Sequence, residues 1–415
     1  MKADIIAIGD ELLIGQTVDT NGAWIAKVLD GAGVEVGRII TIGDDADEIN
    51  AAVAKSFKNN DLVLVTGGLG PTHDDITKDV LCKFFNDKLV FNKQVYEDVC
   101  MLMKKFGRTV NELNKAQAMV PSKCEIMRND RGTAPGMIFN QNGKILFSMP
   151  GVPFEMKNMI SSAVIPMVLG LNITVKKVHR HIKTFGIAEA DLAEKLKPVI
   201  MNLPPSVKMA FLPSPGHVKI RLSVRHEDEE LAHRLILNEE KKILEIIGSG
   251  FYGFNGDSLE DIVGRKLTEL SKSVSTAESC TGGLLASRIT SVPGASVYYK
   301  GSVIAYSNEV KTDLLNVSKD DLDKFGAVSD EVVCQMANGV RKLLRSDYGL
   351  ATSGIAGPEG GTEEKPVGTI WIALADANGV KSIKLKLGFN RTLNISLTTD
   401  HVLNFLRKEL NHSLD

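Results

Sequence analysis

The first part of the chain alternates short apolar runs with stretches in which apolar residues recur every three or four positions. The runs are rich in β-branched residues, which favours strands, and the spaced stretches indicate helices with one buried face. Repeated alternation of strand and helix predicts a doubly wound α/β sheet, with ligands at the carboxyl ends of its strands. The predicted strands cover residues 3–8, 34–42 and 61–66, and the predicted helices cover residues 20–29, 49–57 and the segment from Asp74 onward.

The pattern changes in the middle of the chain, where charged residues become more frequent. Residues 219–225 alternate strictly between apolar and polar positions, which predicts a half-exposed antiparallel strand, and residues 227–247 read as a charged helix. A small α+β module is expected here. The polar face of the strand is basic, a property of some RNA-binding surfaces, but neither a G-x-x-G clamp nor stacking aromatic residues accompany it. We therefore interpret it as a solvated face and do not expect nucleic acid as a partner.

A third segment returns to the α/β pattern after residues 253–258, where Asp257 or Ser258 is a suitable helix N-cap. Its predicted strands cover residues 273–277, 301–306, 348–352 and 369–375, and a closing helix covers residues 392–406. We therefore expect three domains, at residues 1–171, 172–252 and 253–415.

Composition and charge narrow the classes of function. The 415 residues include 49 Lys plus Arg and 51 Asp plus Glu, so a net charge of -2 gives no general attraction to nucleic acid or to an anionic membrane. No signal peptide or membrane span is apparent, which predicts a cytoplasmic protein. The five cysteines are widely spaced and form no C-x-x-C pair, so neither structural zinc nor a disulfide framework is expected.

The third segment places a small nucleophile in a glycine-rich turn. Ser279 lies between a predicted strand and a predicted helix, where neighbouring amides can stabilise an anion; a helix N-cap is the structural alternative. Cys280 is a second possible nucleophile, although a free cysteine is more often a small buried residue. No histidine accompanies these polar segments, so Lys311 is the candidate general base, provided that desolvation lowers its pKa.

A second glycine turn lies in the first segment, at residues 66–75. Its glycines allow phosphates to approach backbone amides, and Asp74 and Asp75 could hold a divalent cation that bridges a diphosphate. The structural alternative is that both acids cap the following helix.

Taken together, these strings resemble the CinA family over essentially the whole chain, including a middle module of KH-like type. In the third segment the resemblance rests on residues 277–283, 305–311, 326–329 and 353–369. In the first segment it rests on Ile8-Gly9-Asp10-Glu11-Leu12-Leu13 with Gly15, Asp19-Thr20-Asn21, residues 66–75, Arg131-Gly132-Thr133-Ala134-Pro135-Gly136 and Pro150-Gly151-Val152-Pro153 with Glu155. The first domain is accordingly similar to the molybdopterin-binding fold.

For the third domain, the resemblance implies hydrolysis of nicotinamide mononucleotide to nicotinate mononucleotide and ammonia, without a cofactor. Ser279 would be the nucleophile and Lys311 the general base, assisted by Tyr306, while Arg391 would bind or orient the substrate. Phe389 and Asn390 precede that arginine here, where the family usually has Gly-Asp. The further candidates for substrate binding are Thr281, Gly282, Gly283, Gly354 and Gly357.

For the first domain, the resemblance implies hydrolysis of ADP-ribose to AMP and ribose 5-phosphate with a divalent cation, either Mg²⁺ or a transition metal. Asp74 and Asp75 would be the metal ligands. The candidates for substrate binding are Glu11, Asp19, Asn21, Gly67, Gly68, Gly70 and Thr72. We also expect a homo-oligomer, most simply a dimer. Two alternatives stay open: a nucleotide-binding interaction protein without catalysis, acting in competence or DNA-damage responses, and a pterin-nucleotide transferase in the first domain.

Overall fold

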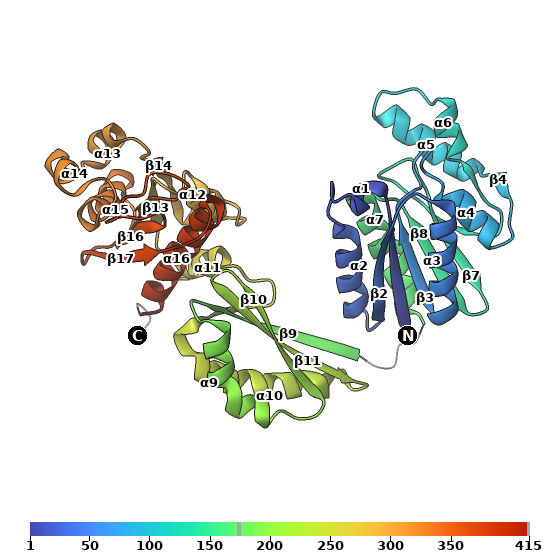
Figure 1. The fold of residues 1–415 in the computed structure, drawn as a ribbon, viewed down its shortest axis with the longest axis horizontal. Coiled ribbons are helices and arrows are strands. Elements are labelled where there is room, and N and C mark those ends of the chain that lie inside the picture. The colour runs from blue at the N-terminus through green and yellow to red at the C-terminus, as the bar shows by residue number, and fades with distance from the viewer. Residues whose placement is uncertain (172–175, 413–415) are drawn as a thin grey trace. The chain divides into compact units, whose positions relative to one another are not determined.

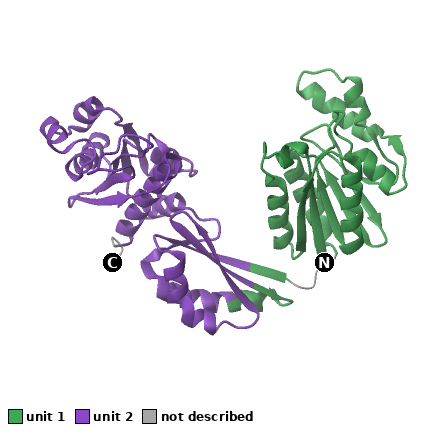
Figure 2. Ribbon diagram, in the orientation of Figure 1, with its two compact units in different colours: residues 1–178, 224–235 green, residues 179–223, 236–415 purple. Residues whose placement is uncertain are grey.

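The computed structural model describes residues 1–171 and 176–412 and divides them into two compact units, shown in Figure 2. Unit 1 contains Met1–Val178 and Val224–Leu235, and unit 2 contains His179–Ser223 and the chain from Ile236. The predicted boundary between residues 171 and 172 adjoins residues that lie outside the described part of the chain. None of the helices within that part is long and apolar enough to cross a membrane.

The first sheet has six strands (Figure 1), and the glycine turn at residues 66–75 begins where one of its central strands ends, at Thr66. In spatial order the strands are β2 (Glu35–Ile42), β1 (Lys2–Ile8), β3 (Leu62–Thr66), β8 (Lys144–Met149), β7 (Gly136–Gln141) and β6 (Glu125–Met127). The first four are parallel neighbours, and β7 pairs antiparallel with both β8 and β6. The remaining elements of this domain are α1 (Asp10–Leu13), α2 (Thr20–Gly31), α3 (Ala46–Asn59), α4 (Thr77–Phe84), β4 (Leu89–Phe91), α5 (Lys93–Lys105), α6 (Glu112–Ala116), β5 (Met119–Pro121), α7 (Pro153–Met159), a π-helix (Ile160–Val164) and α8 (Ile165–Leu169).

Helices cover both faces of this sheet, which confirms the predicted doubly wound architecture. Along β1, Ala3 and Ile5 join a core shared with α2 and α7, whereas Ile6 and Ile8 join a second core shared with α3 and α4. This division follows from the two-residue period of a strand, which sends successive side chains to opposite faces. The helix after the glycine turn begins at Thr77 rather than at Asp74, so the prediction that both acids open it was wrong.

The middle module is a four-stranded sheet with two helices. Its strand order is β10 (Val207–Ser214), β11 (His217–His226), β9 (Lys176–Phe185) and β12 (Phe251–Phe254), with helices α9 (Glu189–Met201) and α10 (Glu229–Ile247). The predicted alternation in β11 is confirmed, because Val218, Ile220, Leu222 and Val224 are buried and the residues between them are partly exposed. Strand β12 extends across the predicted boundary between residues 252 and 253.

The third sheet has five strands and is covered by helices on both faces (Figure 1). In spatial order it contains β14 (Tyr299–Ile304), β13 (Val274–Glu278), β15 (Tyr348–Gly354), β16 (Thr369–Ala375) and β17 (Val380–Lys386). One core includes α11 (Leu259–Glu269), α12 (Leu284–Thr290) and α16 (Arg391–His412), and the other includes α13 (Asn308–Leu315), α14 (Lys319–Phe325) and α15 (Asp330–Leu344). Strands β13, β14 and β15 are parallel neighbours, so their carboxyl ends meet at one edge.

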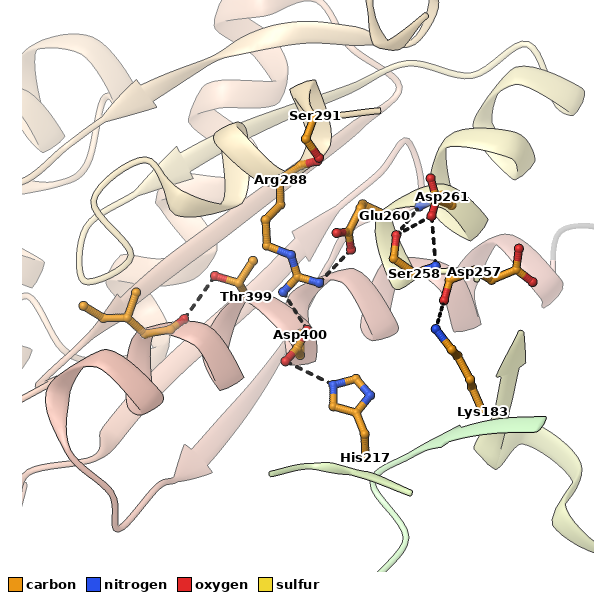
Figure 3. A network of polar contacts seen from close by, with 11 residues as sticks. Lys183, His217, Asp257, Ser258, Glu260, Asp261, Arg288, Ser291, Thr399 and Asp400 are labelled. Carbon is orange, nitrogen blue, oxygen red and sulfur yellow. Dashed lines mark hydrogen bonds and ion pairs between the residues drawn. The ribbon is translucent and has the colours of Figure 1, made fainter. Parts of the chain in front are cut away.

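A buried polar network joins the third domain to the middle module within unit 2, as Figure 3 shows. Arg288 of α12 donates to Asp400 of α16 and to Glu260 of α11, at 2.6 Å in each case. Asp400 also lies 3.2 Å from Nε2 of His217 in β11. Ser258 caps α11 and forms a capping box with Asp261, which confirms one of the two predicted N-caps.

Candidate functional sites

Ser279 occupies the turn between β13 and α12, as predicted. Its amide donates to the Thr352 carbonyl at 3.0 Å, which fixes the turn to the end of β15. Gly282 and Gly283 follow with φ values of 59° and 101°, a conformation that favours glycine and lets α12 begin at Leu284. No hydrogen bond engages the Ser279 hydroxyl within the described part of the chain, so this oxygen is uncommitted.

The amides of this turn are used differently from the prediction. Glu278 is fully buried, and its carboxylate accepts from the Thr281 hydroxyl at 2.7 Å and from the amides of Gly283, Leu285 and Ala286 at 2.8–3.1 Å. This carboxylate therefore satisfies the first turn of α12. The amide of Gly282 donates to the Ser279 carbonyl. We expected the amides of residues 280–283 to bind an anion. Those of Gly282 and Gly283 already have acceptors, so only the amides of Cys280 and Thr281 remain available.

Cys280 is a buried structural neighbour of the serine. Burial raises the pKa of its thiol to about 12, so the reactive thiolate is essentially absent at neutral pH. The charges of both Lys311 and Arg391 act on this thiol. The residue next to Ser279 therefore lies within electrostatic range of both predicted basic groups.

Lys311 is an almost completely buried amine, with 1% of its surface exposed. Its Nζ donates to the Ala305 carbonyl at 2.8 Å and more weakly to the carbonyls of Tyr306 and Ser307 at 3.4 Å. Burial lowers the pKa of Lys311, and the more distant charge of Glu309 only partly opposes this. No carboxylate lies within 4 Å of Nζ among the described residues. Burial without a nearby carboxylate thus disfavours the charged form of this amine. Lys311 follows β14, beside the carboxyl ends of the strands where Ser279 lies.

Tyr306 and Arg391 meet beside the loop that contains Gly357. Arg391 donates to the Tyr306 hydroxyl at 3.2 Å and to the Gly357 carbonyl at 2.8 Å. Its side chain lines a cavity of about 900 Å³, hereafter the carboxyl-terminal cavity, together with residues 356–358 and 389–393. Asn390 accepts from the Leu393 amide at 3.0 Å and so caps α16, which keeps the arginine at the first helical position despite the departure from the family pattern.

Of the remaining substrate-binding candidates of this domain, Gly357 lies in a cavity wall, whereas Thr281 and Gly354 have structural roles. The Thr281 hydroxyl is buried and hydrogen-bonds to Glu278 and Thr352, so it stabilises the turn. Gly357 lines the carboxyl-terminal cavity, and its carbonyl orients Arg391. A side chain on Gly354 would meet Ile370 of β16 at 2.5 Å, so this glycine allows the strands to pack closely.

The glycine turn of the first domain lines a second cavity of about 470 Å³, hereafter the amino-terminal cavity. A Cβ atom on Gly67 would lie 2.1 Å from the Ile8 carbonyl oxygen, and one on Gly68 would lie 2.1 Å from the Thr77 hydroxyl. Both residues have positive φ, so side chains are excluded and backbone faces the cavity. The cavity is lined by residues 8, 9, 11, 44, 67–71, 74, 75, 117, 133, 134, 150–152 and 155.

The Asp75 carboxylate stabilises the glycine turn through hydrogen bonds to other residues of that turn. Its carboxylate accepts from the amides of Gly70 and Thr72, at 2.8 and 2.9 Å, and from the Thr72 hydroxyl at 2.5 Å. These bonds hold the carboxylate inside the turn and displace the start of α4 to Thr77. Asp74 is exposed, and hydrogen bonding within the loop is the main cause that lowers the pKa of its carboxyl. Thr72 itself is not part of the cavity wall.

Two predicted pocket residues lie outside the cavity wall. Asp19 caps α2 by accepting from the Gly22 amide at 2.8 Å. The Asn21 amide donates to the Gly151 carbonyl at 2.7 Å and to Thr66, so it ties α2 to the ends of two strands. Asp19 therefore stabilises the start of α2, and Asn21 ties that helix to the end of β3 and to the loop after β8.

Two further carboxyl groups lie in the wall, Asp44 and Glu155, which were not predicted as site residues. Burial is the main cause that raises the pKa of each, and for Asp44 the charges of Asp10, Glu11 and Asp74 add to it. Lys and Arg are absent from the described wall. Glu155 was visible within a family motif, but nothing in the sequence indicated that residues 44 and 155 line the same cavity.

A divalent cation fits the chemistry of this wall. Within residues 1–171 and 176–412, no three His, Cys, Asp or Glu side chains are grouped closely enough to hold a metal ion by themselves. Mg²⁺ is nevertheless commonly bound by one or two carboxylates together with substrate phosphates and water. Exposed oxygen donors at Asp74 and Glu11, in a cavity without basic residues, fit that mode of binding.

Comparison with known proteins assigns each part of the chain. Residues 4–170 match the probable molybdopterin binding domain, residues 179–253 the damage-inducible protein CinA KH domain, and residues 256–410 the CinA C-terminal domain. The chain is 47% identical to a CinA-like protein of Cytophaga hutchinsonii, with 98% of each chain covered. It is 43% identical to a CinA-like protein of Flavobacterium psychrophilum, with 99% of each chain covered.

Among solved structures, the competence/damage inducible protein CihA from Agrobacterium tumefaciens is 39% identical, with 37% of this chain and 93% of that chain covered and a TM-score of 0.36. The full-length matches at over 40% identity, together with the three consecutive domain matches, show that this chain belongs to the CinA family.

Proposed function

We propose that the third domain is an amidohydrolase that converts nicotinamide mononucleotide into nicotinate mononucleotide and ammonia. The observation that carries this proposal is the buried Lys311 amine without a carboxylate partner, on the same sheet edge as the uncommitted Ser279 hydroxyl. Burial lowers the pKa of Lys311, which makes its amine better suited to accept the serine proton than that of an ordinary surface lysine.

The reaction would proceed in two halves. Lys311 accepts the Ser279 proton as Oγ bonds to the carboxamide carbon, and the amides of Cys280 and Thr281 stabilise the oxyanion. The C–N bond then breaks, and the amide nitrogen takes the proton and leaves as ammonia. Water, deprotonated by the same amine, hydrolyses the acyl-serine ester and restores the hydroxyl.

The substrate phosphate would be held in the carboxyl-terminal cavity. Arg391 is positioned by Gly357 and Tyr306, and a planar guanidinium suits two-point binding of a phosphate. The Tyr306 hydroxyl lies at the same position and would share this contact.

The first test is ammonia release from nicotinamide mononucleotide by the full chain. We expect Ser279→Ala to abolish release, because no other nucleophile is available in the turn. Ser287→Ala is the matched control, since Ser287 is exposed on the adjacent helix α12. Ammonia release by Ser279→Ala at the wild-type rate would reject the assignment.

We further propose that the first domain hydrolyses ADP-ribose to AMP and ribose 5-phosphate. The supporting observation is a glycine turn with backbone facing a cavity that has carboxylates and no basic residues. Asp74 and Glu11 would hold a divalent cation, which when bound neutralises charge on the two phosphates. The chain's own part is to admit the diphosphate at Gly67 and Gly68 and to keep this loop in shape through Asp75.

ADP-ribose turnover in the presence and absence of a strong chelator tests this second activity. We expect turnover to stop on chelation and to return when Mg²⁺ is added in excess. Turnover that persists in the chelator would remove the cation from the proposal. Absence of turnover with bound ADP-ribose would favour the interaction-protein alternative, and binding of a pterin instead would favour the transferase alternative.

A further inference from the structure

Gln117 is a buried amide without any hydrogen-bond partner. It follows α6 directly and has 3% of its surface exposed, yet neither Nε2 nor Oε1 has an acceptor or donor within the described residues. The side chain forms part of the wall of the amino-terminal cavity. A primary amide carries both a donor and an acceptor, so its burial without partners opposes folding.

Gln117 differs from the other buried amides of this domain because both of its polar atoms lack a partner. Asn129 donates to the Ala134 carbonyl and to Glu155 at 2.8 and 2.7 Å, and accepts from the amides of Arg131 and Gly132. Asn21 donates to the Gly151 carbonyl and leaves only its Oδ1 unpaired. Among the described residues of this domain, Gln117 therefore combines two unpaired amide atoms with a place in the wall of the amino-terminal cavity.

We infer that Gln117 binds the adenine base of the nucleotide in the amino-terminal cavity, with Nε2 donating to a ring nitrogen and Oε1 accepting from the exocyclic amino group. This inference depends on the proposed nucleotide-hydrolysing function of the cavity. Adenine presents an acceptor beside a donor, which matches the donor and acceptor of a glutamine amide in a two-point contact. The acidic groups of the cavity cannot supply the donor of such a pair while ionised, whereas Gln117 supplies both partners.

The test compares two ligands that differ in the base. AMP contains adenine, and ribose 5-phosphate lacks it, so their binding to the full chain is measured by calorimetry in Mg²⁺. The variant Gln117→Met keeps the shape of the side chain and removes both polar atoms. Gln141→Met is the matched control, because Gln141 is an exposed glutamine in β7 of the same domain and does not line the cavity.

We expect Gln117→Met to weaken AMP binding about tenfold to a hundredfold, as for the loss of one two-point contact. Ribose 5-phosphate binding should stay at its wild-type value, and Gln141→Met should change neither. The melting temperature of Gln117→Met without ligand should equal or exceed that of wild type, because two unpaired buried atoms are removed.

Three results would overturn the inference. Equal AMP affinity in Gln117→Met and wild type would leave the proposed hydrolase intact and remove the role of Gln117. A clear fall in melting temperature would show that an ordered water or a protein group satisfies the amide. Wild-type protein that binds a pterin but not AMP would reject both the base assignment and the ADP-ribose function.

Discussion

Replacement of Lys311 by methionine should separate activity from stability. Methionine fills nearly the same volume as lysine but carries no amine, so it cannot accept the Ser279 proton. General-base catalysis typically contributes about 10²–10⁴-fold, which corresponds to about 3–5 kcal/mol in the activation barrier. We therefore expect ammonia release by Lys311→Met to fall by that factor.

The free energy of unfolding should change much less, because two effects oppose one another. The substitution leaves the buried Ala305 carbonyl, now bonded at 2.8 Å, without its donor, which costs about 1–3 kcal/mol. It also removes the cost of burying a charged amine, which lowers the pKa of Lys311. At a pH at which the folded protein would bind the proton, each pKa unit of this lowering corresponds to about 1.4 kcal/mol of stability that methionine regains. Because the two effects have opposite signs, the net change in the free energy of unfolding should be smaller than the change in the activation barrier.

The pH dependence gives an independent check. The pKa of Lys311 lies below its ordinary value of about 10.4, so kcat/KM should rise with pH through this lowered pKa. In the window between the folded and unfolded values, the unfolded chain binds more protons, so wild-type stability should increase with pH. The stability difference between Lys311→Met and wild type should shift in favour of wild type across the same window.

The assays are continuous ammonia detection and urea unfolding, both across pH. Lys319→Met is the control, because Lys319 is exposed at the start of α14 and should be nearly neutral in both assays. Lys311→Met with wild-type ammonia release would refute the assignment of the base. A loss of activity accompanied by gross unfolding would refute the view that the amine is held for chemistry rather than for structure.

Three further predictions concern the two turns. A thiol reagent at neutral pH should label Cys280 only after unfolding, because burial raises its pKa to about 12, and rapid labelling of native protein would contradict this. Glu278→Gln should destabilise the third domain by about 2–4 kcal/mol in urea unfolding, because α12 loses a charged acceptor for several donors, whereas the exposed Glu269→Gln should have little effect. Asp74→Asn should weaken the Mg²⁺ dependence of ADP-ribose turnover and leave the melting temperature unchanged. Asp75→Asn should lower the melting temperature, because it removes an acceptor that holds the loop. Equal behaviour of the two variants in both measurements would argue against separate roles.

The order and type of most elements could be predicted from the sequence, because each depends on a local period. Strands at 2–8, 62–66 and 369–375 follow from short, nearly continuous apolar runs, and the helix from Thr20 follows from apolar residues recurring every three or four positions. Strand β17 was not predicted, because its exposed lysines weaken the apolar pattern and its pairing with β16 is what defines it.

Which polar groups meet was decided by the tertiary structure. Ser279, Lys311 and Arg391 were identified from their motifs, but their common sheet edge depends on the order β14-β13-β15. The spacing of Asp74 and Asp75 gave them one role, and only the folded loop distinguishes the exposed carboxylate from the one that accepts three hydrogen bonds.

The sequence by itself thus determined the alternation of strands and helices, the family motifs and the glycines that the turns require, because neighbouring residues impose these. The tertiary structure alone decided that Glu278 accepts from the first amides of α12, that Lys311 is buried without a carboxylate partner among the described residues, and that Gln117 is left unpaired in the wall of a cavity. Hydrogen bonds and desolvation depend on which distant segments pack together, and that information is not contained in any local pattern.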